Sequence, residues 1–340
     1  MKPLISVIIP VYNTKDYLIE AINSIIIQKD FVEEIIIIND GSNDGSKELL
    51  DNLYSRCEFI KILHTQNQGQ GIARNIGTQT AKSDFIYYFD SDDISVQGLF
   101  EKFSATITLI PDLELLCFSA EPFLDPNTSI ENIFSKVELS KDTFLRNTNE
   151  VCGSGEDAFN LLHKKRSFSP VPYLYIFKKS IILQNNILFR SIRYEDEEFT
   201  QKLFLYAKKT YISNEIFCKR RVRSTSVMQL SRSYKDLDGY IKTIETMDEL
   251  VKLKFIKEET RQNLIRRIFE FIRIIIIIKS TNKINFTKKQ KKEFLTKIKP
   301  LIKRDNKLAF LYYTYPTEYK LRIYKALFLN NFLYKKNKFR

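Results

Sequence analysis

The sequence predicts an α/β protein with a doubly wound, mostly parallel sheet, followed by a basic helical region at its C-terminal end. In the first hundred residues, apolar runs rich in Ile, Val, Phe and Tyr alternate with segments of helical periodicity. The runs are nearly continuous in apolarity, which is typical of strands buried on both faces. Lys and Arg are concentrated after residue 230, which predicts that the end of the chain differs in character.

Four strands and three intervening helices are expected in this first part. The strands are predicted over residues 4–12, 34–39, 59–64 and 84–89, and the helices over 15–28, 44–55 and 71–81. Strand–helix–strand units of this kind place parallel strands in one sheet and gather their carboxyl ends at one edge. Ligands of such sheets bind at that edge, so the residues that follow each strand are the first candidates for a site.

The later segments are expected to be more varied. Prolines punctuate residues 111–170, which predicts loops and an inserted variable region. Residues 194–209 have acidic side chains in the first turn and lysines at the end, as a helix dipole favours. Basic amphipathic helices such as 258–279 follow. We expect two domains, at 1–230 and 231–340.

The net charge of +13 belongs to the second of these regions. Residues 1–230 hold 26 Lys and Arg against 30 Asp and Glu, whereas residues 231–340 hold 28 against 11. Such an excess suggests a polyanionic partner, namely an anionic membrane surface or nucleic acid. Nucleic acid is not expected, because no recognisable nucleic-acid module accompanies the charge. The other interpretation is a set of packed helices with a lysine-rich face toward solvent.

Composition excludes several classes of protein. The longest apolar candidate, Ile274 to Ile278, is bracketed by Arg273 and Lys279, far short of the roughly 18 residues that span a bilayer. The first 13 residues suit a strand better than a signal peptide, so a cytoplasmic location is expected, with peripheral contact at the inner face of the membrane. Four dispersed cysteines and two histidines favour neither a thiolate nor a His-rich metal site. Carboxylates must therefore carry most acid–base chemistry.

Glycine-rich phosphate cradles are not matched. Gly69, Gly71 and Arg74 form G-x-G-x-x-R without the third glycine of a dinucleotide fingerprint. A diphosphate would therefore need a divalent ion held by carboxylates. Asp90 and Asp92 come directly after a predicted strand and, two residues apart in extended chain, can face one crevice. Hard oxygen ligands of this kind suit Mg²⁺ or Mn²⁺, whereas the plainer interpretation is a solvated acidic turn.

A third carboxylate lies at the same expected edge. Asp40 follows the predicted strand 34–39 and could equally be a turn residue or cap the next helix. Three acidic positions at the carboxyl ends of one sheet favour a shared site over three independent turns.

Five blocks of the sequence together resemble the family 2, GT-A-type inverting glycosyltransferases. They span about the first 230 residues in the family's order and read SVIIPVYN (6–13), INDGSNDGS (38–46), NQGQGIARNIG (67–77), YYFDSDD (87–93) and NNILFRSIRYEDEEF (185–199). The resemblance implies a GT-A fold and a nucleotide-sugar-binding catalytic domain over 1–230. The region 231–340 lies outside it.

The resemblance implies a nucleotide site at the first two blocks. Pro10, Val11 and Tyr12 would hold the base, and Asp40 would accept a hydrogen bond from it.

The later blocks imply contacts with the rest of the donor. Asp90 would touch the ribose, and Asp92, with Asp90 beside it, would bind the Mn²⁺ or Mg²⁺ ion that bridges the diphosphate. Arg74 would help to close the site, although a buried salt bridge under the sheet is an equal interpretation. Arg223 and Ser226 lie in a segment that resembles the family's basic loop over the donor phosphates.

The same resemblance makes Asp196 the general base, as the aspartate of an ED pair. It would take the proton of the acceptor hydroxyl as that oxygen attacks from the face opposite the leaving diphosphate, with inversion. A helix N-terminus tends to keep Asp196 ionised, which predicts a modest base. Glu195, Glu197 and Glu198 crowd the same turn, so the sequence alone leaves the assignment open.

The sequence thus predicts a metal-dependent inverting glycosyltransferase. The expected donor is a UDP-sugar, and the expected acceptor is a hydroxyl of a cell-surface glycan or lipid-linked saccharide of the cell envelope. Two alternatives are a non-catalytic scaffold that binds membrane or polyanion and a sugar-phosphate or nucleotidyl transferase. Ser83, where the family often has glycine, and the absence of tryptophan from residues 171–179 depart from the family pattern.

Overall fold

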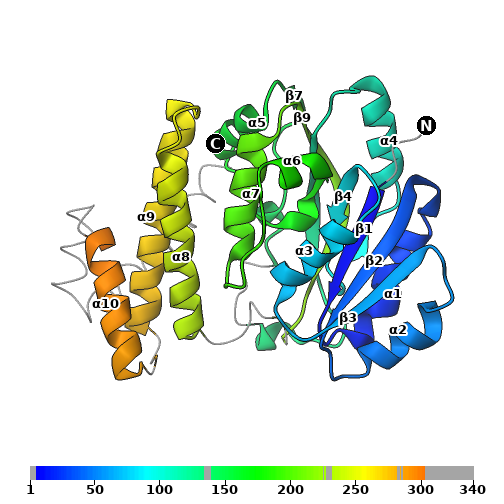
Figure 1. Cartoon of the computed structure of the whole chain (residues 1–340), viewed down its shortest axis with the longest axis horizontal. Coiled ribbons are helices and arrows are strands. Elements are labelled where there is room, and N and C mark those ends of the chain that lie inside the picture. The colour runs from blue at the N-terminus through cyan, green and yellow to red at the C-terminus, as the bar shows by residue number, and fades with distance from the viewer. Residues whose placement is uncertain are drawn as a thin grey trace. The chain divides into compact units, whose positions relative to one another are not determined.

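The computed structural model describes residues 5–133, 139–224, 226, 232–281, 284 and 286–302, which form two compact units (Figure 1). The first unit holds the described residues up to Ser191, those between Glu195 and Leu230, and Ile256–Thr260. The second holds Ile192–Tyr194 and the described residues between Ser231 and Phe255 and from Arg261 onward.

Among its described residues, the first unit has one sheet of nine strands, in the order β3-β2-β1-β4-β8-β6-β9-β5, with β7 also paired to β9. Parallel pairing joins β1 (Ile5–Val11), β2 (Val32–Asp40), β3 (Ile60–Thr65) and β4 (Phe85–Tyr88). This order, with β1 between β2 and β4, is that of a doubly wound sheet. The four strands lie within two residues of the predicted limits at each end, and the α/β class is confirmed.

Antiparallel pairing introduces the second half of the sheet. β8 (Tyr175–Lys178) runs antiparallel to both β4 and β6 (Leu115–Leu124), and β6 is parallel to β9 (Thr210–Val222). The short strands β5 (Ile94–Ser95) and β7 (Glu150–Cys152) pair antiparallel with β9. The sheet is therefore parallel at its N-terminal strands and mixed beyond β4.

Helices of the first unit connect the strands, as Figure 1 shows. Their bounds are α1 Lys15–Ile26, α2 Ser46–Tyr54, α3 Gln70–Thr80, α4 Leu99–Leu109, α5 Gly155–Lys164, α6 Lys179–Gln184 and α7 Glu195–Tyr206. Helix α3 approaches the sheet closely at Gly77, where an added Cβ would lie 2.3 Å from a methyl carbon of Ile8. Only glycine allows this close approach of the second half of α3 to β1.

The expectation of loops over residues 111–170 is wrong. This segment contains β6, β7 and α5, and β6 lies inside the sheet with its first six residues buried. The prolines do not prevent these elements from forming, because Pro111 lies before β6 and Pro122 lies in its less buried second half. The apolar run Leu115–Phe118 was the available signal for a strand.

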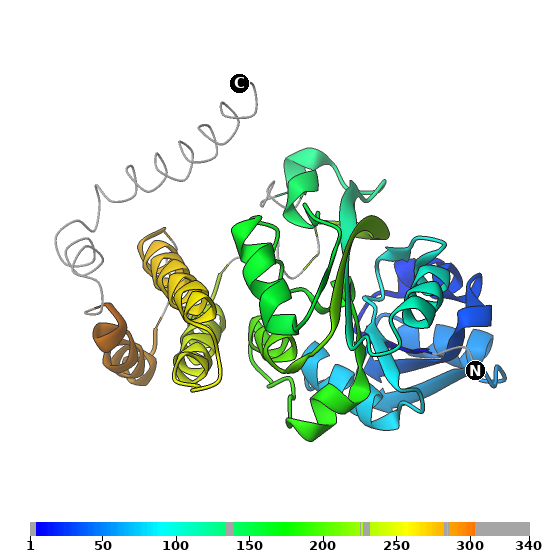
Figure 2. The same ribbon diagram turned by 90° about the horizontal axis from the view of Figure 1, so that it is seen from above.

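The described residues of the second unit form three helices, α8 (Tyr234–Val251), α9 (Glu258–Thr281) and α10 (Lys288–Ile302), which Figures 1 and 2 show side by side. The first three residues of α9 belong to the first unit. A capping box between Ser233 and Asp236 begins α8. Their shared core includes Leu237, Ile244, Phe271, Ile275, Phe294 and Ile298. Across the described residues, no helix combines the length and apolarity needed to cross a membrane.

Candidate active site

The carboxyl ends of the parallel strands β1, β2, β3 and β4 lie at one edge of the sheet, as their pairing shows. Val11 at the end of β1 pairs with Asn39 of β2, and Asp40 pairs with Thr65 at the end of β3. β4 ends opposite Ile8, so the chain from Phe89 onward emerges at the same edge of the sheet. The predicted blocks after three different strands therefore meet at one edge, as parallel pairing requires.

Hydrogen bonds fasten the loops at this edge to one another. The Asn13 N–H donates to Ser42 Oγ at 3.1 Å, and the Asn43 N–H donates to Asn13 Oδ1 at 2.9 Å. The hydroxyls of Thr14 and Ser91 lie 2.8 Å apart. The loop after β1 is thus tied both to the loop after β2 and to the segment Asp90–Asp93, the DSDD segment.

The first predicted nucleotide residues differ in exposure. Pro10 and Val11 are buried within β1, whereas the side chain of Tyr12 is 50% exposed. Any contact of this segment with a ligand would therefore come from the Tyr12 ring or from the backbone. The positive φ of 53° at Asn13 turns the chain directly after Tyr12.

Asp40 is buried and organises the loop that begins α3. Its carboxylate accepts hydrogen bonds from the N–H groups of Gln68 and Gly69, at 2.9 and 2.8 Å, and from the Thr65 hydroxyl at 3.2 Å. A carboxylate offers about four acceptor positions, so about one remains for a ligand. Gly69 has a φ of 98°, a backbone conformation that favours glycine.

Asp90 is held by the first turns of α3. Its Oδ1 accepts from Gln70 Nε2 at 2.8 Å and from Arg74 Nη2 at 2.9 Å. Burial raises the pKa of Asp90, Arg74 counteracts that rise and the nearby Asp92 adds to it.

Arg74 connects the DSDD segment with the ED pair. Besides its bond to Asp90, its Nη1 lies 3.8 Å from Glu195 Oε1, and its side chain is almost fully buried. The guanidinium carbon lies 5.9 Å from the Tyr88 ring centroid and 5.4 Å from that of Phe189. The buried salt bridge that was one interpretation of Arg74 is therefore present, and it joins two predicted motifs.

Two arginines at the end of β9 hold the other DSDD carboxylates. Arg223 Nε donates to Asp92 Oδ2, and Arg221 Nε donates to the Asp92 carbonyl, both at 2.8 Å. The Arg221 N–H donates to the buried Asp93 at 2.8 Å. Burial raises the pKa of Asp93 well above its usual range, and Asp92 and Asp90 add to the rise. Both guanidiniums lie over the Tyr17 ring.

Asp93, Arg221 and Tyr17 were not predicted as site residues. The sequence places Asp93 beside Asp92 and Arg221 beside Arg223, but adjacency alone does not show which one faces the carboxylates. Ser226 was predicted as a contact of the donor phosphates. Among the described contacts, its N–H donates to the Arg223 carbonyl at 3.1 Å. These contacts do not link Ser226 to the carboxylates.

Asp196 lies in the first turn of α7, and its Oδ1 accepts from the N–H of Glu197 at 2.9 Å. Burial raises the pKa of Asp196 well above its usual range, Glu195 and Glu197 raise it further, and Arg74 opposes the shift. The expectation of a modest base kept ionised by the helix N-terminus is therefore wrong, because desolvation and like charges outweigh the helix dipole. A raised pKa makes Asp196 a stronger base once ionised.

The neighbouring Glu198 has a structural role. It is buried and pairs with Lys202 at 2.7 Å and with Arg190 Nε at 2.6 Å. Glu195 faces Arg74, as described above. These pairings argue against Glu198 and Glu195 as the base.

The carboxylates of Asp90 and Asp92 fit a hard divalent ion. Asp90 uses only Oδ1, and Asp92 only Oδ2, in side-chain hydrogen bonds within the described chain. One oxygen of each is therefore available, and Mg²⁺ is commonly bound by one or two carboxylates together with substrate phosphates. The described residues contain no group of three or more His, Cys, Asp or Glu side chains that could hold a metal alone. An ion held by Asp90 and Asp92 would therefore need further oxygen ligands from a bound substrate.

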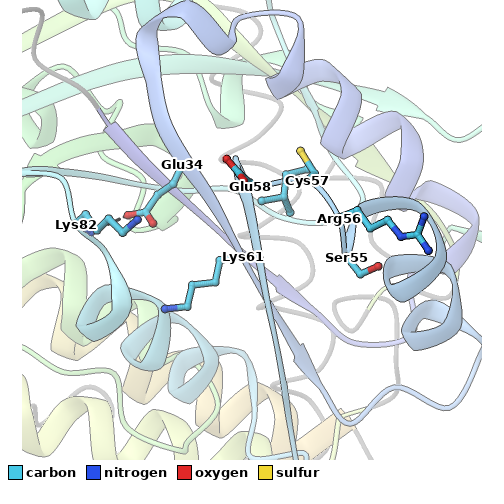
Figure 3. Close-up of a pocket in the computed structure, with 8 residues that line it drawn as sticks. Glu34, Ser55, Arg56, Cys57, Glu58, Lys61 and Lys82 are labelled. Carbon is cyan, nitrogen blue, oxygen red and sulfur yellow. Dashed lines mark hydrogen bonds between the residues drawn. The ribbon is translucent and has the colours of Figure 1, made fainter.

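A separate pocket of about 550 Å³ lies at the opposite edge of the sheet (Figure 3). Its lining includes Glu34 near the start of β2, Ile60 at the start of β3 and Lys82 after α3. Glu34 Oε1 accepts from the Ser6 hydroxyl at 2.8 Å and from the Lys82 N–H at 2.7 Å. The pocket contains none of the predicted site residues and its buried carboxylate already has two donors.

Comparison with known proteins matches both the sequence and the fold. The model of glycosyl transferase family 2 matches residues 6–112. The uncharacterized glycosyltransferase YibD of Escherichia coli (strain K12) is 28% identical over 252 residues, covering 72% of this chain and 70% of YibD. The cholesterol galactosyltransferase of Borreliella burgdorferi is 27% identical over 273 residues, covering 78% of this chain and 72% of its own.

A solved structure of S. aureus TarS 1-349 in complex with UDP-GlcNAc has a TM-score of 0.67 and 18% identity, over 94% of this chain and 88% of that chain. This likeness confirms the GT-A-type fold that the sequence resemblance implied. The family match covers the segment that carries Asp40, Arg74, Asp90 and Asp92. Residues 6–112 therefore belong to glycosyl transferase family 2, and the chain that contains them is a glycosyltransferase.

Proposed function

We propose that this glycosyltransferase moves a sugar from a UDP-sugar to a hydroxyl of a surface glycan or lipid-linked saccharide, with inversion at the anomeric carbon. One observation carries the proposal. Arg74 bonds Asp90 and also faces Glu195, so the carboxylates after β4 and those at the start of α7 form one site. An inverting transfer needs donor-binding groups and a base on opposite sides of one reacting carbon.

The donor would lie along the strand ends. The half-exposed Tyr12 offers a ring face for the base, beside the backbone of Pro10 and Val11. The remaining acceptor position of Asp40 suits a base N–H. Asp90 would bind the ribose.

The diphosphate would be neutralised by an ion and by the end of β9. Asp92, with Asp90 beside it, would hold Mn²⁺ or Mg²⁺, which would balance the charge that develops on the leaving diphosphate. Arg223 already lies 2.8 Å from Asp92 and its planar fork matches phosphate oxygens. Ser226, whose N–H donates to the Arg223 carbonyl, would add a hydroxyl contact.

Asp196 would act as the base. It would take the proton from the acceptor hydroxyl while that oxygen bonds to the anomeric carbon, and the bond from this carbon to the diphosphate oxygen would break with its electron pair leaving on UDP. Its raised pKa suits proton acceptance near neutral pH better than an ordinary aspartate does.

The UDP assignment is supported by names among the comparisons. Structures of TarS are described in complex with UDP-GlcNAc and with UDP, and one relative is a cholesterol galactosyltransferase. These names favour a UDP-hexose donor and are compatible with a hydroxyl on a lipid or lipid-linked acceptor.

A thermal-shift panel tests the donor site. The purified protein is heated with UDP, GDP, CDP or dTDP, each with and without Mn²⁺, alongside Asp92→Ala. A ligand at about 100 times its Kd stabilises the folded state by about 2.7 kcal/mol, which corresponds to roughly 5–10 °C for a domain of this size. We expect a Mn²⁺-dependent shift with UDP that Asp92→Ala removes. A shift with another nucleotide instead of UDP would assign that nucleotide to the donor sugar. No shift with any of the four would contradict the proposed donor site.

An anionic membrane at the cytoplasmic face is proposed as a partner of the second unit. Helix α10 buries Phe294 and Ile298 and exposes several lysines, including Lys288, Lys291 and Lys292. Each lysine near an anionic lipid surface contributes about 1 kcal/mol to the free energy of membrane binding. Co-sedimentation with vesicles of phosphatidylglycerol, but not of phosphatidylcholine, would support this contact. Equal binding to both, or to neither, would contradict it.

A further inference from the structure

Asn75, the residue after Arg74 on α3, holds the backbone of Phe189 at both polar groups. Its Nδ2 donates to the Phe189 carbonyl at 2.8 Å, and its Oδ1 accepts from the Phe189 N–H at 3.0 Å. A carboxamide carries one acceptor and one NH₂ group, so it can satisfy both backbone groups of a residue at once. This two-point attachment fixes Phe189 against α3 more strictly than a single bond would.

Phe189 in turn connects three elements of the first unit. Its ring is stacked on that of Phe199 in α7, with centroids 3.9 Å apart and an interplanar angle of 8°. It also meets the Tyr88 ring of β4 edge-on at 5.5 Å, and only 2% of the residue is exposed. Asn75 therefore holds a residue that lies between the end of β4 and the helix that begins with the ED pair.

The segment from Phe189 toward the ED pair is closely packed on the start of α3. A Cβ added at Gly71 would lie 2.8 Å from Phe189 Cβ and 3.0 Å from Glu195 Cγ. The Ser191 hydroxyl donates to the Gln68 carbonyl at 3.0 Å. The start of α3 thus touches both the attachment point and the ED pair itself.

We propose that Asn75 is a positioning residue for glycosyl transfer, which sets Asp196 against the donor-binding carboxylates by fixing the backbone of Phe189. The inference rests on the proposed function. Helix α3 holds Asp90 through Arg74 and Phe189 through Asn75, so adjacent residues restrain the donor side and the base side of the site. A displacement of about 1 Å in a reacting geometry can cost about 10²-fold in rate.

The test separates donor binding from turnover. Release of UDP from UDP-galactose and from UDP-GlcNAc is measured with Mn²⁺ in the full chain and in Asn75→Ala, and binding of UDP with Mn²⁺ is measured by calorimetry. We expect kcat to fall about 10- to 100-fold, while the Kd of UDP with Mn²⁺ changes by less than about twofold. A role confined to stability would leave kcat of the folded fraction unchanged.

Two further variants serve as an alternative to Asn75→Ala and as a control. Asn75→Ser keeps a polar group, but its single hydroxyl is one bond closer to the backbone than the carboxamide atoms and should hold Phe189 less firmly. It is expected to give an intermediate kcat and replaces Asn75→Ala if that variant does not fold. Asn147→Ala is the matched control, because Asn147 donates to the Lys165 carbonyl at 3.4 Å and is exposed, and kcat should not change.

The outcomes distinguish the two proposals. Unchanged kcat in folded Asn75→Ala, or a parallel loss of affinity for UDP with Mn²⁺, would overturn the positioning role while leaving the proposed function intact. Failure of the unsubstituted protein both to bind UDP with Mn²⁺ and to release UDP would overturn the proposed function and this role with it.

Discussion

Replacing Arg74 by methionine tests the central contact of the site. Arg74 is 2% exposed, and its partner Asp90 has a side chain that is 22% exposed. Removing one member of a buried ion pair costs about 3–5 kcal/mol because it leaves the other charge without compensation. Since Asp90 keeps some contact with water, we expect the lower end, about 3 kcal/mol. The midpoint of thermal unfolding should then fall by about 6–12 °C.

The pH dependence gives this prediction a definite sign. Burial already raises the pKa of Asp90 in the folded state, and Arg74 opposes the rise. Loss of Arg74 raises that pKa further, so the folded variant holds the Asp90 proton more tightly than the unfolded chain does. Stability from such a group is present below the unfolded pKa and is lost as pH rises through the folded pKa. The deficit of the variant should therefore shrink as pH falls toward 4.

Urea unfolding of the unsubstituted protein and Arg74→Met, at pH 7.5 and at pH 5, measures both effects. Arg74→Met combined with Asp90→Asn is the matched control, because it removes the uncompensated carboxylate and should recover part of the loss. A deficit below about 1 kcal/mol at pH 7.5, or one that does not depend on pH, would refute the buried-pair argument.

Further predictions concern chemistry, packing and metal affinity. Asp196→Asn should retain folding and the binding of UDP with Mn²⁺ but lose transfer, and transfer at the unsubstituted rate would assign the base elsewhere. Because the pKa of Asp196 is raised, the acidic limb of the kcat profile should have its midpoint above the usual aspartate value of about 3.9, and a midpoint at that value would argue against Asp196. Gly77→Ala places a methyl 2.3 Å from Ile8 and should lower the free energy of unfolding by about 1–3 kcal/mol in urea titrations, whereas equal stability would mean that α3 can move away. Arg223→Gln removes the partner of Asp92 and should tighten binding of Mn²⁺ alone about tenfold in paramagnetic titrations, and weaker binding would mean that Arg223 orients Asp92 for the ion.

The sequence determined the first four strands, the helices between them and the carboxylates at their ends. These features depend on local order, because continuous apolar runs and helical periodicity are visible within windows of a dozen residues. Once the strands are parallel, their carboxyl ends must share an edge, so Asp40, Asp90 and Asp92 follow from the pattern. The resemblance to a family then connected these positions with Asp196.

Tertiary structure alone decided what surrounds those carboxylates. The placement of β6, β8 and β9 depends on pairing between residues distant in sequence, and it brings Arg221 and Arg223 to the DSDD segment. The direction of the Asp196 pKa shift is likewise a sum over burial and charges from other elements, and it reversed the expectation taken from the helix N-terminus. Local pattern predicts which residues form each element, whereas burial, long-range pairing and electrostatic environment exist only after the elements have packed together.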